Sequence, residues 1–249
     1  MKSYAKNAKV NGFVIGISGG IDSAVTSTLC AKTGFPVLCV EMPIHQAQNQ
    51  VSRGREHISY LKHSFEKVTS TEVNLTTTFD NFKNAVPIVN NEDTVSLSLA
   101  NTRARLRMTT LYYLAGLHGY LVAGTGNKVE DFGVGFFTKY GDGGVDLSPI
   151  ADLLKSEVRQ LAAFLEVPKS ILEAKPTDGL FGDNRSDEDQ IGANYDELEW
   201  AMTQDDLGKV ITDFSGRKAT VFKIYKRLNT INQHKMHPIP VCIIPKNLK

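Results

Sequence analysis

The chain has 249 residues, and its 28 Lys and Arg nearly balance 27 Asp and Glu, which leaves a formal net charge of +1. Apolar residues make up 41% of the chain, enough for a sizeable core, so disorder is excluded for most of its length. The neutral balance argues against a dedicated nucleic-acid-binding protein, and no apolar run reaches the roughly 18 residues of a membrane span. The length and the lack of a linker predict one domain over residues 1–249.

The cysteines and the N-terminus carry information on the cellular compartment. Cys30, Cys39 and Cys242 form no C-x-x-C pair and are odd in number, so we expect reduced core thiols rather than disulfides. The chain starts with basic residues but lacks the apolar segment of a secretory signal. We therefore expect a cytoplasmic protein.

Short buried strands alternate with helices in the first part of the chain. We expect a strand over 12–17, a helix over 23–32, a strand over 36–42, a helix over 48–63 and a strand over 65–68. Such alternation is typical of right-handed βαβ units. The predicted fold class is therefore α/β, a Rossmann-like open parallel sheet with helices on both faces.

Further elements follow, with charged segments near the end of the chain. We expect a helix over 94–118, a strand over 120–124, an irregular stretch over 132–149 and a helix over 152–165, capped by Asp152. The long helix carries one apolar stripe: Leu97, Ala100, Ala104, Met108, Leu111 and Ala115. The segments 183–206 and 217–249 are acidic and basic. Both suit solvated faces, although the basic segment also suits contact with phosphate.

The stretch G-I-S-G-G-I-D-S at residues 16–23 lies between the first expected strand and helix. Ligands of open α/β sheets bind at such strand ends. Glycines allow close backbone approach, and the unpaired N–H groups of a helix N-terminus attract anions. The loop therefore suits phosphate oxygens, with a plain glycine turn capped by Asp22 as the structural alternative.

Three better-known motifs fit this loop poorly. A Walker A loop requires a lysine for the phosphates, and residues 16–23 contain none. The dinucleotide fingerprint G-x-G-x-x-G does not match either. The nucleophile elbow G-x-S-x-G matches literally, but its oxyanion hole uses an upstream strand–helix loop. The 17 residues before Ser18 leave no room for such a loop.

The S-G-G-I-D-S string at 18–23 resembles the S-G-G-x-D-S loop of the N-type ATP pyrophosphatases. In that superfamily the loop cradles the pyrophosphate of ATP while the α-phosphorus is attacked, on a fold of the adenine nucleotide alpha hydrolase type. Asp22 would repel phosphate unless a cation bridges the two. Mg²⁺ suits this role, because it binds one or two carboxylates together with phosphates.

Three further strings narrow the resemblance to the NAD synthetase family over nearly the whole chain. They are G-T-G-N-K-V-E at 124–130, F-F-T-K-Y-G-D-G-G-V-D at 136–146 and K-P-T at 175–177. Many relatives have G-T-D-H-A-x-E at the first string and one residue fewer before the Phe-Phe pair, which indicates a subfamily difference.

The resemblance implies that ATP and deamido-NAD⁺ react with ammonia to give NAD⁺, AMP and pyrophosphate. The nicotinate carboxylate forms an acyl adenylate, and ammonia displaces AMP. We expect free ammonia as the nitrogen donor, because no amidase domain precedes the synthetase motifs and no cysteine sits in a glutaminase context. The family also implies a homodimer, although the helix that helps form the dimer in relatives is not expected in the roughly ten residues before the first strand.

Site roles are carried over from the family by motif position. Asp22 and Glu130 are the expected Mg²⁺ carboxylates. Asp142 is the candidate general base that takes a proton from ammonium, and Lys155 supplies the positive charge that the loop lacks. The expected ATP contacts are Gly16, Ile17, Ser18, Gly19, Gly20, Ile21, Asp22, Ser23, Thr125, Lys155 and Thr177. The expected deamido-NAD⁺ contacts are Arg105, Lys139, Asp146, His234 and Lys235.

Two other functions stay open at this point. The chain could be another N-type ATP pyrophosphatase, such as a GMP synthetase-like or tRNA-modifying enzyme, although the neutral charge disfavours tRNA. It could also be a non-catalytic nucleotide-binding module. Three carboxylates beside a phosphate loop, Asp22, Glu130 and Asp142, argue against pure binding.

Overall fold

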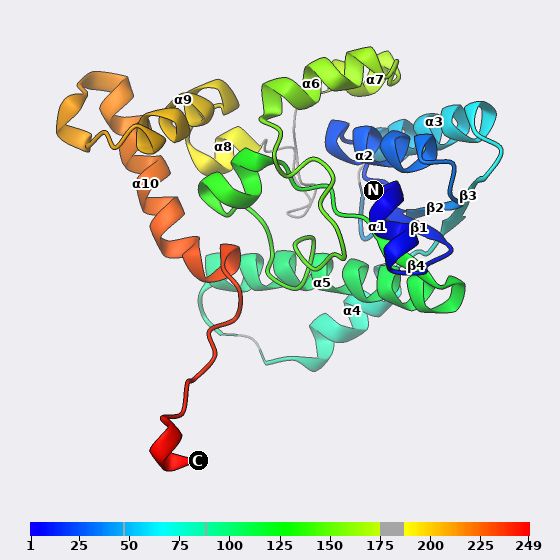
Figure 1. The fold of residues 1–249 in the computed structure, drawn as a ribbon, viewed down its shortest axis with the longest axis horizontal. Helices are drawn as coiled ribbons and strands as arrows, with labels where there is room; N and C mark the ends of the chain where they lie inside the picture. The colour runs from blue at the N-terminus through cyan, green and yellow to red at the C-terminus, as the bar shows by residue number, and fades with distance from the viewer. Residues whose placement is uncertain (47, 88, 175–186) are drawn as a thin grey trace.

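A computed structural model describes residues 1–46, 48–87, 89–174 and 187–249 (Figure 1). It contains a four-stranded sheet in the order β3-β2-β1-β4, and all three neighbouring pairs are parallel. The strands are β1 (Gly12–Gly16), β2 (Val37–Glu41), β3 (Val68–Glu72) and β4 (Tyr120–Val122). The predicted open parallel sheet is thus confirmed.

Side chains of the central strands alternate between two apolar layers. Phe13 and Ile15 of β1 face α2 (Ile21–Lys32) and α3 (Gln48–Ser64). Val14 faces the opposite layer, formed by α4 (Thr76–Ala85) and α5 (Glu92–His118). In Figure 1, α2 and α3 lie above the strands and α4 and α5 below them. Because both faces are covered, the sequences of the two central strands, β1 and β2, are almost continuously apolar.

A second cluster of helices lies beside the sheet and carries part of the site. A short π-helix, η1 (Val129–Val134), packs with α8 (Asp187–Ile191), α9 (Tyr195–Asp206) and α10 (Gly216–Met236). The helices α6 (Lys155–Phe164) and α7 (Lys169–Leu172) pack against α2. The remaining elements are α1 (Lys2–Asn7), η2 (Ile211–Asp213) and η3 (Lys246–Leu248). None of the described helices is long and apolar enough to cross a membrane.

Several local predictions are wrong. The third strand begins at Val68 rather than at residue 65, because Phe65 still donates its N–H to Leu61 of α3. A short helix, α1, is present before the first strand. Leu97 of the expected buried stripe is 55% exposed, because it lies near the start of α5, away from the sheet.

Two further expectations fail at the ends of elements. The sixth helix begins at Lys155 with Leu154 as its cap, because the exposed Asp152 carboxylate pairs with Lys128 at 3.0 Å instead of capping the helix. Cys30 and Cys39 are buried as predicted, but Cys242 is exposed because it lies in the C-terminal segment, which extends away from the body (Figure 1).

Candidate active site

The loop between β1 and α2 is folded by its own serines. The Ser18 and Ser23 hydroxyls lie 3.1 Å apart, Gly20 donates its N–H to Ser18 Oγ at 3.2 Å, and Ser23 Oγ donates to the Gly20 carbonyl at 2.9 Å. Gly19 has φ +78°, and a Cβ there would lie 2.4 Å from the Gln50 carbonyl oxygen of α3. Only glycine fits this close approach, so the loop is held tightly against α3.

A polar cleft of about 160 Å³ opens above this loop. Residues 18–23 form its floor, and Thr125 follows β4 at the neighbouring strand end. Besides Asp22 of the floor, the charged side chains that line it come from α3, η1, the loop at residue 142 and α6: Arg53, Glu130, Asp142, Lys155 and Arg159. The structure therefore brings the predicted phosphate loop, both predicted metal carboxylates and Lys155 to one place.

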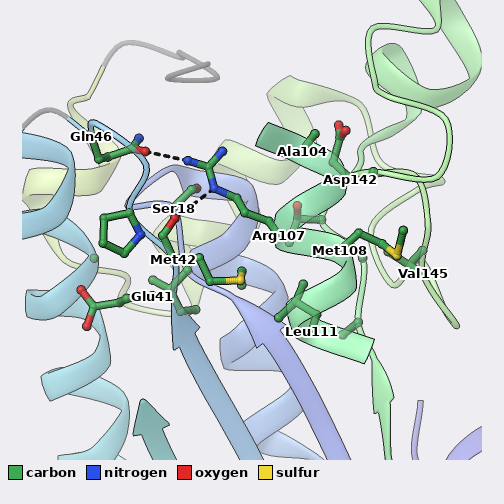
Figure 2. Close-up of a pocket in the computed structure, with 18 of the residues that line it drawn as sticks. Ser18, Glu41, Met42, Gln46, Ala104, Arg107, Met108, Leu111, Asp142 and Val145 are labelled. Carbon is green, nitrogen blue, oxygen red and sulfur yellow. Dashed lines mark hydrogen bonds between the residues drawn. The ribbon is translucent and has the colours of Figure 1, made fainter. Parts of the chain in front are cut away.

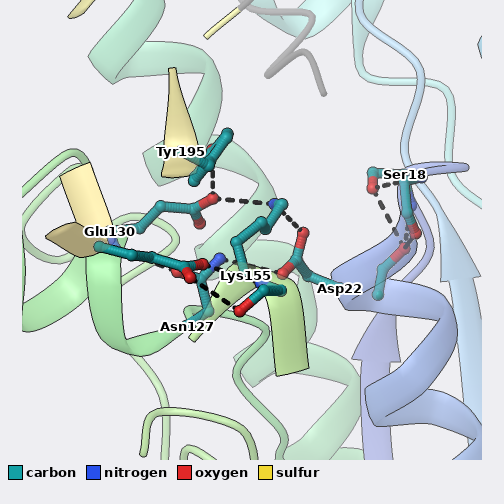
Figure 3. A network of polar contacts seen from close by, with 10 residues as sticks. Ser18, Asp22, Asn127, Glu130, Lys155 and Tyr195 are labelled. Carbon is teal, nitrogen blue, oxygen red and sulfur yellow. Dashed lines mark hydrogen bonds and ion pairs between the residues drawn. The ribbon is translucent and has the colours of Figure 1, made fainter. Parts of the chain in front are cut away.

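Lys155 lies between the two predicted metal ligands (Figure 3). Its Nζ is 2.6 Å from Asp22 Oδ2 and 3.0 Å from Glu130 Oε1, and only 3% of its side chain is exposed. Burial alone would lower the pKa of Lys155, but the two carboxylates outweigh burial and hold the pKa above its ordinary value. The lysine therefore stays charged and neutralises most of the repulsion between the carboxylates.

Two polar residues that the sequence analysis did not single out complete this cluster. Asn127 is buried, donates to Asp22 Oδ1 at 3.0 Å and accepts the Glu130 N–H at 3.1 Å. The buried Tyr195 of α9 donates its hydroxyl to Glu130 Oε1 at 2.5 Å. Asn127 could have been found, since it lies in the 124–130 string, whereas no local signal connects Tyr195 with Glu130.

Two carboxylates have strongly raised pKa values: Asp142, which lines the cleft, and Asp131, the neighbour of Glu130 in sequence. Asp142 lines the cleft and accepts the Thr138 N–H at 2.9 Å, and desolvation by the surrounding protein raises its pKa to about 6. Asp131, which the sequence analysis missed, is desolvated beside Glu130, and its pKa rises to about 8. Both groups therefore titrate near neutral pH, where proton transfer is most useful.

A mostly apolar cavity of about 250 Å³ adjoins the polar cleft (Figure 2). Met42, Met108, Leu111 and Val145 supply apolar walls. Arg107 donates to the Met42 carbonyl at 3.1 Å and to Gln46 Oε1 at 2.9 Å at one end of the cavity. Four residues line both spaces, which are therefore adjacent: Ser18, Gln50, Thr125 and Asp142.

Four of the five predicted deamido-NAD⁺ contacts lie together, where α5 meets the end of α10. Arg105 donates twice to the Lys139 carbonyl at 3.3 Å, and Lys139 Nζ donates to the His234 carbonyl. Lys235 donates to the Gly135 and Phe137 carbonyls at 2.7 and 2.8 Å, and burial lowers its pKa.

Asp146 makes a separate set of contacts. It accepts from the Tyr112 hydroxyl at 3.1 Å and from the Val122 N–H at 2.8 Å. Among the described residues, no hydrogen bond joins it to Arg105, Lys139 or Lys235. Thr177, the last predicted ATP contact, lies outside the described residues.

The carboxylate pair is compatible with the magnesium ion that the sequence analysis predicts. Asp22 and Glu130 reach one ammonium nitrogen, so both can reach one cation. No group of three or more metal-ligating His, Cys, Asp or Glu side chains occurs in the described part of the chain. Two carboxylates without further protein ligands match Mg²⁺, which keeps waters and phosphate oxygens as its other ligands.

A lysine-free glycine loop after the first strand of a parallel sheet, with a carboxylate inside it, is similar to the loop of the N-type ATP pyrophosphatases. The sequence model of the NAD synthase family matches residues 1–239, and the chain belongs to this family.

Named relatives and solved structures agree with this assignment. The NH₃-dependent NAD⁺ synthetase of Mesoplasma florum is 42% identical over 201 residues, which cover 80% of this chain and 79% of the relative. That of Syntrophomonas wolfei is 35% identical and covers 100% of this chain and 94% of its own length. The solved NMN synthetase of Francisella tularensis superposes with a TM-score of 0.81 at 30% identity, covering 98% of this chain and 93% of that one.

Proposed function

We propose that this protein is an ammonia-dependent NAD synthetase. It would couple deamido-NAD⁺ and ATP to an acyl adenylate with release of pyrophosphate, after which ammonia displaces AMP to give NAD⁺. The observation that carries the proposal is the polar cleft, in which the phosphate loop meets Asp22, Glu130, Asp142 and Lys155 next to an apolar cavity.

The two adjacent spaces suit the two parts of ATP. The cavity of about 250 Å³ offers apolar walls to the adenine. The cleft offers backbone N–H groups at the start of α2 to the β- and γ-phosphates, where the helix dipole favours negative charge. The α-phosphorus would then lie at the junction, near Thr125 and Asp142.

Magnesium would be held by Asp22 and Glu130 together with the phosphates of ATP, and it would neutralise phosphate charge during attack on the α-phosphorus. The chain's own residues prepare this place. Lys155 holds the two carboxylates close together through its ion pairs with both. Asn127 and Tyr195 fix their orientation through hydrogen bonds to Asp22 and Glu130.

Asp142 is suited to generate the nucleophile. Ammonia is mostly ammonium at neutral pH, and ammonium has no lone pair with which to attack. Asp142 borders both the cleft and the cavity, so its carboxylate can attract ammonium and take up a proton. Its pKa of about 6 leaves it ionised at neutral pH yet basic enough for general-base catalysis.

The basic group beside α10 would bind deamido-NAD⁺. Arg105, Lys139 and Lys235 present cationic side chains within one small region, together with the exposed His234. Guanidinium and ammonium groups suit the diphosphate and the nicotinate carboxylate.

The nitrogen donor provides a direct test. We expect purified protein to form NAD⁺ from deamido-NAD⁺, ATP and an ammonium salt, and to form almost none with glutamine. Chromatography of the nucleotides measures NAD⁺ and AMP, and a coupled assay measures pyrophosphate. Pyrophosphate release that is independent of deamido-NAD⁺ would favour another ATP pyrophosphatase, and no release at all would favour a binding module.

A second substrate deserves a parallel assay, because a solved NMN synthetase shares 30% identity and nearly the whole fold with this chain. Such an enzyme makes the nicotinamide mononucleotide, which lacks the adenylate half of NAD. We expect a higher kcat/KM for deamido-NAD⁺ than for nicotinate mononucleotide. The reverse preference would assign the chain to the mononucleotide reaction while leaving the adenylate chemistry unchanged.

We also propose a homodimer formed through the exposed face around Asp146. Tyr4 donates its hydroxyl to the Asp146 carbonyl at 3.3 Å, and the adjacent end of α5 exposes Tyr113 and Leu117. Large exposed apolar side chains grouped in this way suit a subunit interface. A boundary here would place Asp146 beside the partner's deamido-NAD⁺ site, which would explain why it lies apart from Arg105.

The Tyr113→Glu variant tests this interface. A buried carboxylate without a partner is costly, so we expect the variant to shift from dimer to monomer in light scattering at micromolar concentration. Lys223→Glu, an exposed change on α10, is the control and should leave the mass unchanged. A wild-type protein that is monomeric would remove the dimer proposal.

A further inference from the structure

The main lysine of the cleft is already engaged with protein carboxylates. Lys155 contacts Asp22 and Glu130 at 2.6 and 3.0 Å and is almost fully buried. The departing pyrophosphate carries several negative charges, and Asp142 adds another beside the same cleft. The cleft therefore needs further cationic groups. Its other lining cations among the described residues are Arg53 and Arg159.

Arg53 is positioned at the phosphate loop by α3. Its Nε donates to the Gly19 carbonyl at 3.2 Å. A Cβ on Gly19 would lie 3.3 Å from the Arg53 Cβ, so loop and helix are in close contact. Arg53 also lines the cleft, and a guanidinium has five N–H donors, of which the bond to Gly19 uses the one on Nε.

Arg159 approaches the cleft from the other side of α2. It follows Lys155 by one turn of α6, so the two side chains lie on the same helix face. Its ion pair with the exposed Asp196 is long, at 4.0 Å, and its side chain is 44% exposed. Such exposed pairs contribute little, so Arg159 can turn toward a phosphate at small cost. The helices α3 and α6 both pack against α2 (Figure 1).

We propose that Arg53 and Arg159 are the cationic ligands of the departing pyrophosphate and flank it from α3 and α6. This assignment rests on the proposed function, because it presumes that the loop at 18–23 holds the pyrophosphate of ATP. Arginine binds phosphate through paired N–H groups. The loop contains no lysine, and the positive charge of Lys155 is paired with Asp22 and Glu130. The two arginines thus supply the positive charge that the pyrophosphate requires.

Titration calorimetry with inorganic pyrophosphate and Mg²⁺ tests the assignment without turnover. We expect Arg53→Gln and Arg159→Gln each to raise the pyrophosphate Kd by about tenfold or more, with the Kd of AMP unchanged. Arg53→Lys should recover part of the affinity, because it keeps the charge. Arg55→Gln is the matched control on α3: Arg55 pairs with Glu72 at 2.8 Å, is absent from the cleft lining and should leave pyrophosphate binding unchanged.

The results distinguish direct binding of pyrophosphate by Arg53 from structural support of the loop by Arg53. Equal weakening of pyrophosphate and AMP by Arg53→Gln would show that Arg53 only buttresses Gly19, and the assignment would fall. Wild-type pyrophosphate affinity in both glutamine variants would also overturn it. Arg159→Gln alters an exposed position, so it remains informative if Arg53→Gln does not fold. A wild-type enzyme that binds pyrophosphate but forms no NAD⁺ would refute the proposed function. The calorimetry of the arginine variants would still show whether Arg53 and Arg159 bind pyrophosphate.

Discussion

Replacing Lys155 with methionine is expected to lower the free energy of unfolding by about 3–5 kcal/mol and turnover by more than about 10²-fold. Methionine keeps much of the side-chain volume but removes the charge between Asp22 and Glu130. Two carboxylates would then remain in a desolvated place without their shared cation. Breaking a buried ion pair by removing one partner is costly, because the other charge stays uncompensated.

Chemical denaturation of Lys155→Met against wild-type protein measures this loss. Lys128→Met is the control: Lys128 also pairs with an aspartate at 3.0 Å, but on the surface, where such a pair contributes less than about 1 kcal/mol. Mg²⁺ should restore part of the stability of Lys155→Met, because it can bridge the two carboxylates. Equal stability of the two variants would contradict the role given to Lys155.

The sheet was predictable because its strands are buried on both faces. An apolar run that ends in glycines, as at residues 12–16, needs no tertiary information to be read as a central strand. The edge strand β3 has the polar sequence V-T-S-T-E, so its hydrophobic pattern is weak and its position was misjudged. The α9 helix did carry a readable signal, since Asn194 and Glu197 form a capping box.

The loop and the carboxylates were predictable as a group, because the carboxyl ends of parallel strands meet at one edge of the sheet. Which side chains of this group contact one another was not predictable. Lys155 lies 133 residues from Asp22 in sequence, and motif position gave it a role toward ATP without indicating that it bonds both metal carboxylates. The contact of Tyr195 with Glu130 depends on how α9 packs against η1, which no local pattern encodes.

Arg105 illustrates a different limit. Spacing places Arg103 and Arg107 on one face of the helix and Arg105 on another, but it does not say which face meets a substrate. In the structure Arg103 stacks over the Phe79 ring at 4.2 Å, and Arg107 lies in the apolar cavity. Arg105 contacts the Lys139 carbonyl instead. The three roles follow from what each face of α5 packs against, which is tertiary information.

Changing Asp142 to asparagine is expected to lower kcat by about 10²–10⁴-fold, the usual cost of losing a general base. Asparagine has nearly the same shape, and its carbonyl oxygen can still accept the Thr138 N–H that Asp142 accepts at 2.9 Å. The backbone turn should therefore persist, and the loss would report proton transfer. Saturating ammonium should not restore kcat, because the variant can bind ammonium but cannot deprotonate it.

The dependence of the turnover rate on pH tests the same role of Asp142. Desolvation by the surrounding protein raises the pKa of Asp142 to about 6, so the carboxylate is mostly protonated below that pH and mostly ionised above it. The wild-type rate should rise with pH through about 6, and Asp142→Asn should lack this limb while retaining a slow, flatter dependence. A variant with near-wild-type kcat at every ammonium concentration would exclude Asp142 as the base. Asp131 does not line the cleft, so it is not placed to replace Asp142.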